Sequence, residues 1–349
     1  MSVSTYAYVN ARIGGMKSYL LRDEDLRGLI ESRNLEELVS LLKNTRYGVD
    51  ISEPGVLSME LQLKRSLYRD YLKLINSVEG RPKSFVQTVA KRFEVETLKS
   101  IIKMKFLKIA LSEYLIPFGQ MNEVLIERLM RAEGISSLIE EMRGTEYRNI
   151  LKKVRQRMTE KKEGEESLEE EAKDLPYLNA LEEHYFTEVK ESMEGLSKKD
   201  KAMVKRFVGF NIDISNFLMG LRLRGIEEDV GKYFLGGGES FTLKHFSIVT
   251  NLENLSRLPD VVPRRFVEIA KEALERYNET KSLLSFELVT KKQLLKESRK
   301  LFLGARFHIG TIIAYLNLKE NEISNLIKII KTKDEFFDTK EIEKLLVYV

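Results

Sequence analysis

The chain has 349 residues, with 58 Lys or Arg against 54 Asp or Glu and a formal net charge of +4, so its charge balance gives no support to a nucleic-acid-binding protein. It contains no Cys, which excludes disulfides, thiolate metal sites, iron–sulfur clusters and cysteine nucleophiles. No stretch approaches the roughly 18 uncharged apolar residues of a membrane helix, and residues 1–10 lack the pattern of a signal peptide, so we expect a soluble, cytoplasmic chain of two or three domains.

Apolar residues recur at intervals of three and four along the chain, beginning with residues 29–47. This period is typical of helices, and the Asn-Gly and Asp-Gly turns that would indicate β-hairpins are missing. Only six prolines interrupt the chain, which leaves long intervals in which helices can form. The sequence therefore predicts an all-α fold.

Residues 29–47 align without a gap with residues 129–147. Both segments end in Thr-x-Tyr, at Tyr47 and Tyr147, shortly after Asn44 or Gly144. Asn and Gly tolerate the left-handed conformation that ends many helices. We interpret each pair as a helix stop with a tyrosine packed back on the helix.

Three segments that begin at Glu94, Asp213 and Glu322 share a second pattern. Each reads acid, β-branched, any residue, Thr or Asn, then Leu or Phe, and each ends in a basic-x-basic pair that begins nine positions after the acid. The pattern recurs about every 110 residues, and self-similarity at this spacing predicts three diverged copies of one helical unit.

The shared pattern has two interpretations. The acid precedes an apolar helical face and the basic pair follows it, which matches the helix dipole and would stabilise three similar helices. Alternatively, the basic pairs take equivalent places around a pseudo-threefold axis and meet an acidic partner. The candidate interface residues under this second interpretation are Lys103, Lys105, Arg222, Arg224, Lys331 and Lys333.

The copies divide the chain into residues 1–116, 117–232 and 233–349. The second copy contains an insertion at residues 152–174, in which most side chains are charged. Such a stretch cannot bury a face, so we expect a solvated helical extension or a mobile loop there. A regulatory or docking role is the alternative.

Signals for catalysis or cofactors are weak. His184, His245 and His308 lie far apart and outside any metal-binding frame, and the glycine run at 236–238 lacks the Lys-Ser or Lys-Thr of a phosphate loop. The sequence therefore predicts no enzyme activity, no catalytic residue, no metal and no cofactor in this chain.

Several segments together resemble a known family. They are YAYVNARI at residues 6–13, the Thr45-x-Tyr47-Gly48 helix end, the three acid-to-basic segments, and IGTIIAYL at residues 309–316 with the following KENEISNL. In order and spacing these resemble the C subunit of archaeal-type rotary ATP synthases, whose eukaryotic relative is the d subunit of the vacuolar proton pump. The resemblance covers nearly the whole chain, and only residues 152–174 depart from it.

The resemblance implies a funnel of three helical domains with pseudo-threefold symmetry. Such a protein joins the central-stalk subunits to the membrane rotor ring of proteolipid subunits. It transmits torque for ion translocation, linked to ATP synthesis or hydrolysis, and does no chemistry itself. We accordingly expect a peripheral protein at the cytoplasmic face of the membrane, in contact with the bilayer only through its partners. A helical scaffold with other partners and, less favoured, a nucleic-acid-binding helical protein are the alternatives.

Overall fold

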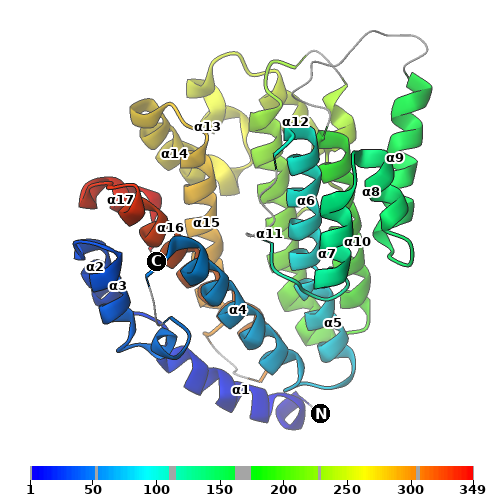
Figure 1. Ribbon diagram of the computed structural model, residues 1–349. Coiled ribbons are helices and arrows are strands. Elements are labelled where there is room, and N and C mark those ends of the chain that lie inside the picture. The colour runs from blue at the N-terminus through cyan, green and yellow to red at the C-terminus, as the bar shows by residue number, and fades with distance from the viewer. Residues whose placement is uncertain are drawn as a thin grey trace. The chain divides into compact units, whose positions relative to one another are not determined.

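The computed structural model describes residues 2–51, 54–109, 115–161, 174–226, 229–303 and 307–348 (Figure 1). Within these ranges the chain forms α-helices and short 3-10 helices, with one isolated bridge between Phe118 and Met121 and no strand. The predicted all-α fold is confirmed. No helix in the described ranges is both long enough and apolar enough to cross a bilayer.

The chain folds into two compact units. Unit 1 combines residues 1–82 with residues 196–349, and unit 2 contains residues 83–195. The predicted copies, by contrast, are divided near residues 116 and 232 on sequence similarity alone. That division, like the funnel with its pseudo-threefold axis, stays a prediction.

In unit 2, α10 packs against both α6 and α9, and apolar residues of all three helices belong to one core cluster. The helices of this unit are α5 (Gly80–Ala90, which begins just before the unit), α6 (Arg92–Leu107), α7 (Glu123–Arg131), α8 (Ile135–Glu141), α9 (Tyr147–Lys161) and α10 (Leu175–Glu194). The charged insertion begins as the largely exposed remainder of α9, as expected for a solvated helical extension, and residues 162–173 lie outside the described residues. The mobile-loop alternative falls on those residues and stays a prediction.

Unit 1 brings the two ends of the chain together. Its longest helices are α11 (Lys198–Arg222) and α16 (Gly310–Asp334), and α16 packs against α1, α3, α4, α15 and α17. The others are α1 (Ser2–Ser18), α2 (Asp23–Glu31), α3 (Leu35–Leu42), η1 (Arg46–Val49), α4 (Val56–Ile75), η4 (Val230–Tyr233), α12 (Leu243–Thr250), η5 (Leu255–Arg257), α13 (Leu258–Val261), η6 (Arg264–Phe266), α14 (Val267–Thr280), α15 (Leu284–Lys300) and α17 (Thr339–Leu345). Helix α16, the last long helix of the sequence, thus packs in unit 1 against α1, α3 and α4 from the start of the sequence.

The predicted helix stops lie at the ends of α3 and α8. Thr45 donates its hydroxyl to the Leu42 carbonyl at 2.7 Å, and Thr145 donates to the Met142 carbonyl at 2.9 Å. Tyr47 and Tyr147 are fully buried, as predicted. Gly144 takes the left-handed conformation with φ +85°, but Asn44 does not, so only one of the two stops has the expected backbone.

Candidate functional site

The three repeated acids lie on three different helices, and each side chain is buried in the protein interior. Glu94 is in α6, Asp213 in α11 and Glu322 in α16, and none exposes more than 6% of its surface. A buried carboxylate is costly unless hydrogen bonds replace its hydration. The partners of these acids therefore indicate what the repeated pattern does.

Each acid accepts a backbone N–H from a segment that leads into a pair of small helices. Glu322 accepts from Leu21 at 2.5 Å, just before α2. Asp213 accepts from Ser240 at 2.7 Å, just before α12. The backbone N–H of Gln120, just before α7, bonds to Glu94. The same residue of the pattern thus anchors similarly placed segments three times, and the Glu322 anchor links α16 to the segment just before α2.

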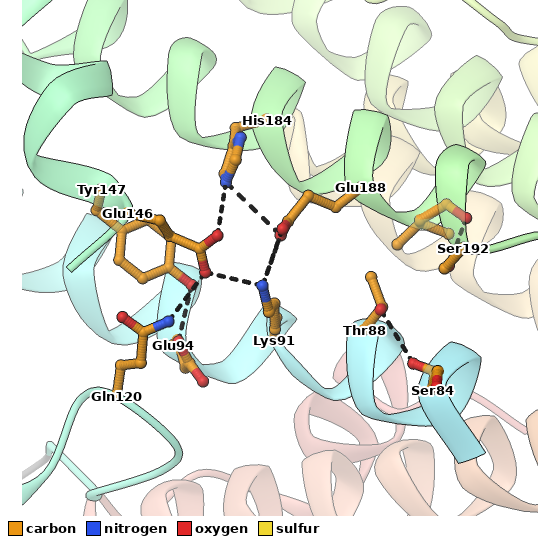
Figure 2. Close-up of polar contacts among 11 residues, drawn as sticks. Ser84, Thr88, Lys91, Glu94, Gln120, Glu146, Tyr147, His184, Glu188 and Ser192 are labelled. Atoms are coloured by element: carbon orange, nitrogen blue, oxygen red, sulfur yellow. Dashed lines mark hydrogen bonds and ion pairs between the residues drawn. The ribbon is translucent and has the colours of Figure 1, made fainter. Parts of the chain in front are cut away.

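A hydroxyl completes each anchor. Tyr47 donates its hydroxyl to Glu322 in unit 1, and Tyr147 donates to Glu94 at 2.8 Å in unit 2 (Figure 2). The two patterns that the sequence presented separately, the helix-stop tyrosines and the motif acids, are therefore hydrogen-bond partners.

The Asp213 anchor uses a different hydroxyl. Phe266 follows Tyr147 at the same interval at which Asp213 follows Glu94, but a phenylalanine has no hydroxyl to donate. The Ser240 hydroxyl instead donates to Asp213 at 2.8 Å.

In the two copies that have an Asn in the pattern, this Asn binds the backbone of a later segment of the chain. The Asn216 amide donates to the Leu235 carbonyl at 2.8 Å and accepts from the Leu235 N–H at 2.8 Å. Asn325 makes the same paired contact with Val347, at 2.9 and 3.1 Å. The acid of all three copies and the amide of the second and third therefore bind backbone, which supports the interpretation that the repeated pattern stabilises similar helices.

Asp213 provides a pH test of this role. Burial raises the pKa of its carboxyl, and the hydrogen bonds from Ser240 and Glu239 only partly oppose this. Because the folded-state pKa is above the unfolded one, the protonated form stabilises unit 1 at low pH, and this contribution is lost as pH rises through the folded pKa. Between pH 4 and pH 7 the wild type should therefore lose stability relative to Asp213→Asn, as measured by urea midpoints.

The control for this prediction is Asp260→Asn, which changes an exposed carboxylate on α13. Its stability difference from the wild type should stay nearly constant between the two pH values. A constant difference for Asp213→Asn as well would contradict the role assigned to burial.

Around Glu322 the anchor extends into a charge-balanced network in unit 1. Lys319 donates to Glu322 at 2.7 Å, and both side chains are buried. Arg46, next to Tyr47, pairs with Asp70 of α4 at 2.9 Å. Two cations and two carboxylates therefore compensate one another between η1, α4 and α16.

The equivalent network in unit 2 has a different charge balance. Lys91 precedes Glu94 by three positions, as Lys319 precedes Glu322, but the residue before the tyrosine is Glu146 in place of an arginine. The Lys91 ammonium donates to Glu146 at 2.8 Å and to Glu188 of α10 at 2.9 Å (Figure 2).

His184 completes this cluster. Its Nε2 lies 3.4 Å from Glu146 Oε2 and 3.6 Å from Glu188 Oε2. Sequence reasoning missed the cluster, although the His184–Glu188 spacing of four on one helix was a signal for it.

The six candidate interface residues fall into both units, and their surroundings differ. In unit 2, Lys103 is exposed, whereas Lys105 donates to the carbonyls of Met130 and Ala132 at the end of α7, and burial lowers its pKa. Lys105 thus has a local structural role.

The unit 1 candidates lie at the ends of α11 and α16. Arg222 is half exposed and pairs with Glu287 at 2.6 Å, while half-buried Arg224 has an Nη1 without a hydrogen-bond partner among the described residues. Lys331 pairs with Glu60 at 2.7 Å, and burial lowers the pKa of Lys333. Of the six residues, Arg222, Arg224 and Lys103 are the least involved in contacts with buried groups, so they remain candidates for a partner interface.

Comparison with known proteins gives similarity over almost the entire chain. Residues 9–345 match the sequence model of the ATP synthase (C/AC39) subunit family. The A-type ATP synthase C subunit of Methanocaldococcus jannaschii is 30% identical over 363 residues, which cover 99% of this chain and 87% of the relative. The C subunits of Methanobrevibacter smithii (24% identical, 99% of this chain and 89% of the relative) and Methanococcoides burtonii (26%, 99% and 95%) are similar over comparable lengths. The matched region includes all three anchors.

Proposed function

The chain belongs to the ATP synthase (C/AC39) subunit family, and from this premise we propose that it is a non-catalytic central-rotor component of an A-type ATP synthase. In this role it joins the central-stalk subunits to the membrane rotor ring of proteolipid subunits and transmits torque between them. It acts at the cytoplasmic face of the membrane and reaches the bilayer only through these partners. It binds no nucleic acid and no cofactor for this task.

The observation that carries the proposal is the full-length match, which includes all three anchoring helices. The carboxylates of these helices are occupied by backbone and hydroxyl hydrogen bonds and therefore hold the fold together. Buried, hydrogen-bonded links between distant parts of a chain resist relative motion, which suits a part that carries load.

Co-expression tests this function directly. We expect the chain to co-elute with the central-stalk subunits of the same genome in size-exclusion chromatography, with a native mass that equals the sum of the partners. It should also be retained on membranes that contain the rotor ring, and should hydrolyse no ATP when purified alone. Elution apart from the stalk together with loss from those membranes would favour a helical scaffold with other partners.

The basic pair at the end of α11 provides a more specific test. Arg222→Glu with Arg224→Glu should weaken co-elution with the stalk or ring at least tenfold while helicity is unchanged, because complementary charges across an interface contribute to affinity and association rate. The change also breaks the Arg222–Glu287 pair, but a surface pair of this kind contributes only about 0–1 kcal/mol to stability.

Glu287→Gln is the matched control, because it breaks the same pair and leaves both arginines in place. It should assemble like the wild type. If the double reversal lowers helicity, or if the control weakens assembly equally, the basic pair has a structural role and no interface role.

A further inference from the structure

The cluster of Glu146, His184 and Glu188 in unit 2 has the composition of a metal site. One oxygen of each carboxylate faces the same imidazole nitrogen, at 3.4 and 3.6 Å from His184 Nε2 (Figure 2). The three ligand atoms lie within 4.8 Å of one another. A four-coordinate ion with bonds of about 2.0–2.2 Å separates its ligand atoms by about 3.3–3.6 Å, which the two measured distances match.

The imidazole nitrogen lies within ion-pair distance of both carboxylates but forms no hydrogen bond among the described residues. His184 Nε2 is buried and makes no hydrogen bond among the described residues, although it points at two carboxylates. Buried polar atoms without a partner are uncommon in folded proteins and call for an explanation. A cation bound between the three side chains would use this nitrogen and both facing oxygens.

The charges of the cluster favour the same conclusion. Lys91 neutralises one of the two carboxylates, so with a neutral imidazole the cluster keeps one net negative charge. The related network around Lys319 and Glu322 in unit 1 balances two cations against two carboxylates and has no such deficit.

From this geometry we infer that Glu146, His184 and Glu188 bind one divalent transition-metal ion, with Zn²⁺ as the best match. Imidazole nitrogen and carboxylate oxygen are ligands of Zn²⁺, and three protein ligands leave a fourth position for water. The ion links the start of α9 to α10. This inference goes beyond the rotor role and does not depend on it.

Lys91 orients the two carboxylates of this site. Its ammonium donates to Oε1 of both glutamates, at 2.8 and 2.9 Å, and also to Oε2 of Glu188 at 3.1 Å, while Oε2 of each glutamate faces the imidazole. Such contacts to the outer oxygen of a ligand orient it toward the ion. About a quarter of the His184 and Glu146 side chains is exposed, which provides an entry path.

The test uses the purified full-length chain after chelator treatment and dialysis, with Co²⁺ as a spectroscopic probe and Zn²⁺ as competitor. We expect one equivalent of Co²⁺ to produce the intense visible absorption of four-coordinate cobalt, and one equivalent of Zn²⁺ to displace it. Zn²⁺ should also raise the melting temperature of the wild type. His184→Gln should weaken binding at least tenfold and abolish the thermal shift.

His245→Gln is the matched control, since His245 lies in unit 1 and contacts Thr242 instead of a carboxylate. It should bind Co²⁺ like the wild type. Glu188→Gln is a second ligand variant, and circular dichroism of both ligand variants shows whether the fold is kept. Equal Co²⁺ binding by the wild type and a folded ligand variant, or a cobalt spectrum without four-coordinate bands, would overturn the inference.

Discussion

Replacing Lys319 by methionine is expected to lower the free energy of unfolding by about 3–5 kcal/mol, the cost of removing one partner of a buried ion pair. Lys319 is fully buried on α16, where its ammonium donates to Glu322 at 2.7 Å and lies 4.2 Å from the centre of the Tyr47 ring. Burial lowers the pKa of this amine, and the Glu322 carboxylate opposes that shift. Without the ammonium, the Glu322 charge stays buried with only hydroxyl and backbone donors.

Urea unfolding followed by circular dichroism measures the loss, and hydrogen exchange locates it in η1 and α16. Lys296→Met, an exposed lysine on α15, should change stability by less than about 0.5 kcal/mol. Adding Glu322→Gln to Lys319→Met should cost less than the sum of the two single changes, because it removes the uncompensated charge. Breaking a buried ion pair normally costs several kcal/mol. If Lys319→Met lowers the free energy of unfolding by less than about 1 kcal/mol, the network around Glu322 contributes little to the stability of unit 1.

Gly119→Ala is expected to destabilise unit 2 by about 3 kcal/mol, the sum of a backbone cost and a steric one. Gly119 has φ +54°, a conformation that costs other residues about 1–2 kcal/mol. An added Cβ would also lie 1.8 Å from Oε1 of Glu94. It would displace the buried carboxylate from its partners, Tyr147 and the Gln120 backbone, at a further cost of about 1–3 kcal/mol. Urea unfolding of the variant measures the total.

Two other glycines separate the two contributions. Gly144 has φ +85° with nothing within 4 Å of an added Cβ, so Gly144→Ala should cost only the backbone contribution of about 1–2 kcal/mol. Gly238 follows Asp213 at the same interval at which Gly119 follows Glu94, and its Cβ would lie 2.1 Å from Asp213 Oδ1. Gly238→Ala should therefore show the steric cost alone. If Gly119→Ala and Gly144→Ala were equally mild, the close approach to Glu94 would not constrain the fold.

Sequence periodicity was sufficient for the helices, and the Thr-x-Tyr helix stops indicated the buried tyrosines. Tyr47 and Tyr147 follow runs with apolar residues at every third or fourth position, and local spacing of this kind determines which helix face is buried. The basic pairs were a harder case, because Lys105 binds the carbonyls at the end of a neighbouring helix while Lys103 is exposed. Residues two apart on a helix face different surroundings, which spacing alone does not specify.

The cluster around His184 could not be predicted from local sequence motifs. Glu146 and His184 are far apart in the sequence and belong to no local pattern, so only the packing of α9 against α10 brings them together. The prediction that this chain holds no metal rests on local frames, and it is the expectation that the cobalt experiment puts to the test.

The sequence by itself determined the helical class, the three copies of the acid-to-basic pattern and the family, because each depends on local spacing or on matches along the chain. Only the tertiary structure decided what the repeated acids do. Glu94 and Asp213 are anchored to Gln120 and Ser240, which lie further along the chain, whereas Glu322 is anchored to Leu21 near the first residues. A buried carboxylate needs donors wherever the fold supplies them, and for Glu322 the fold supplies them from residues about 300 positions earlier in the chain.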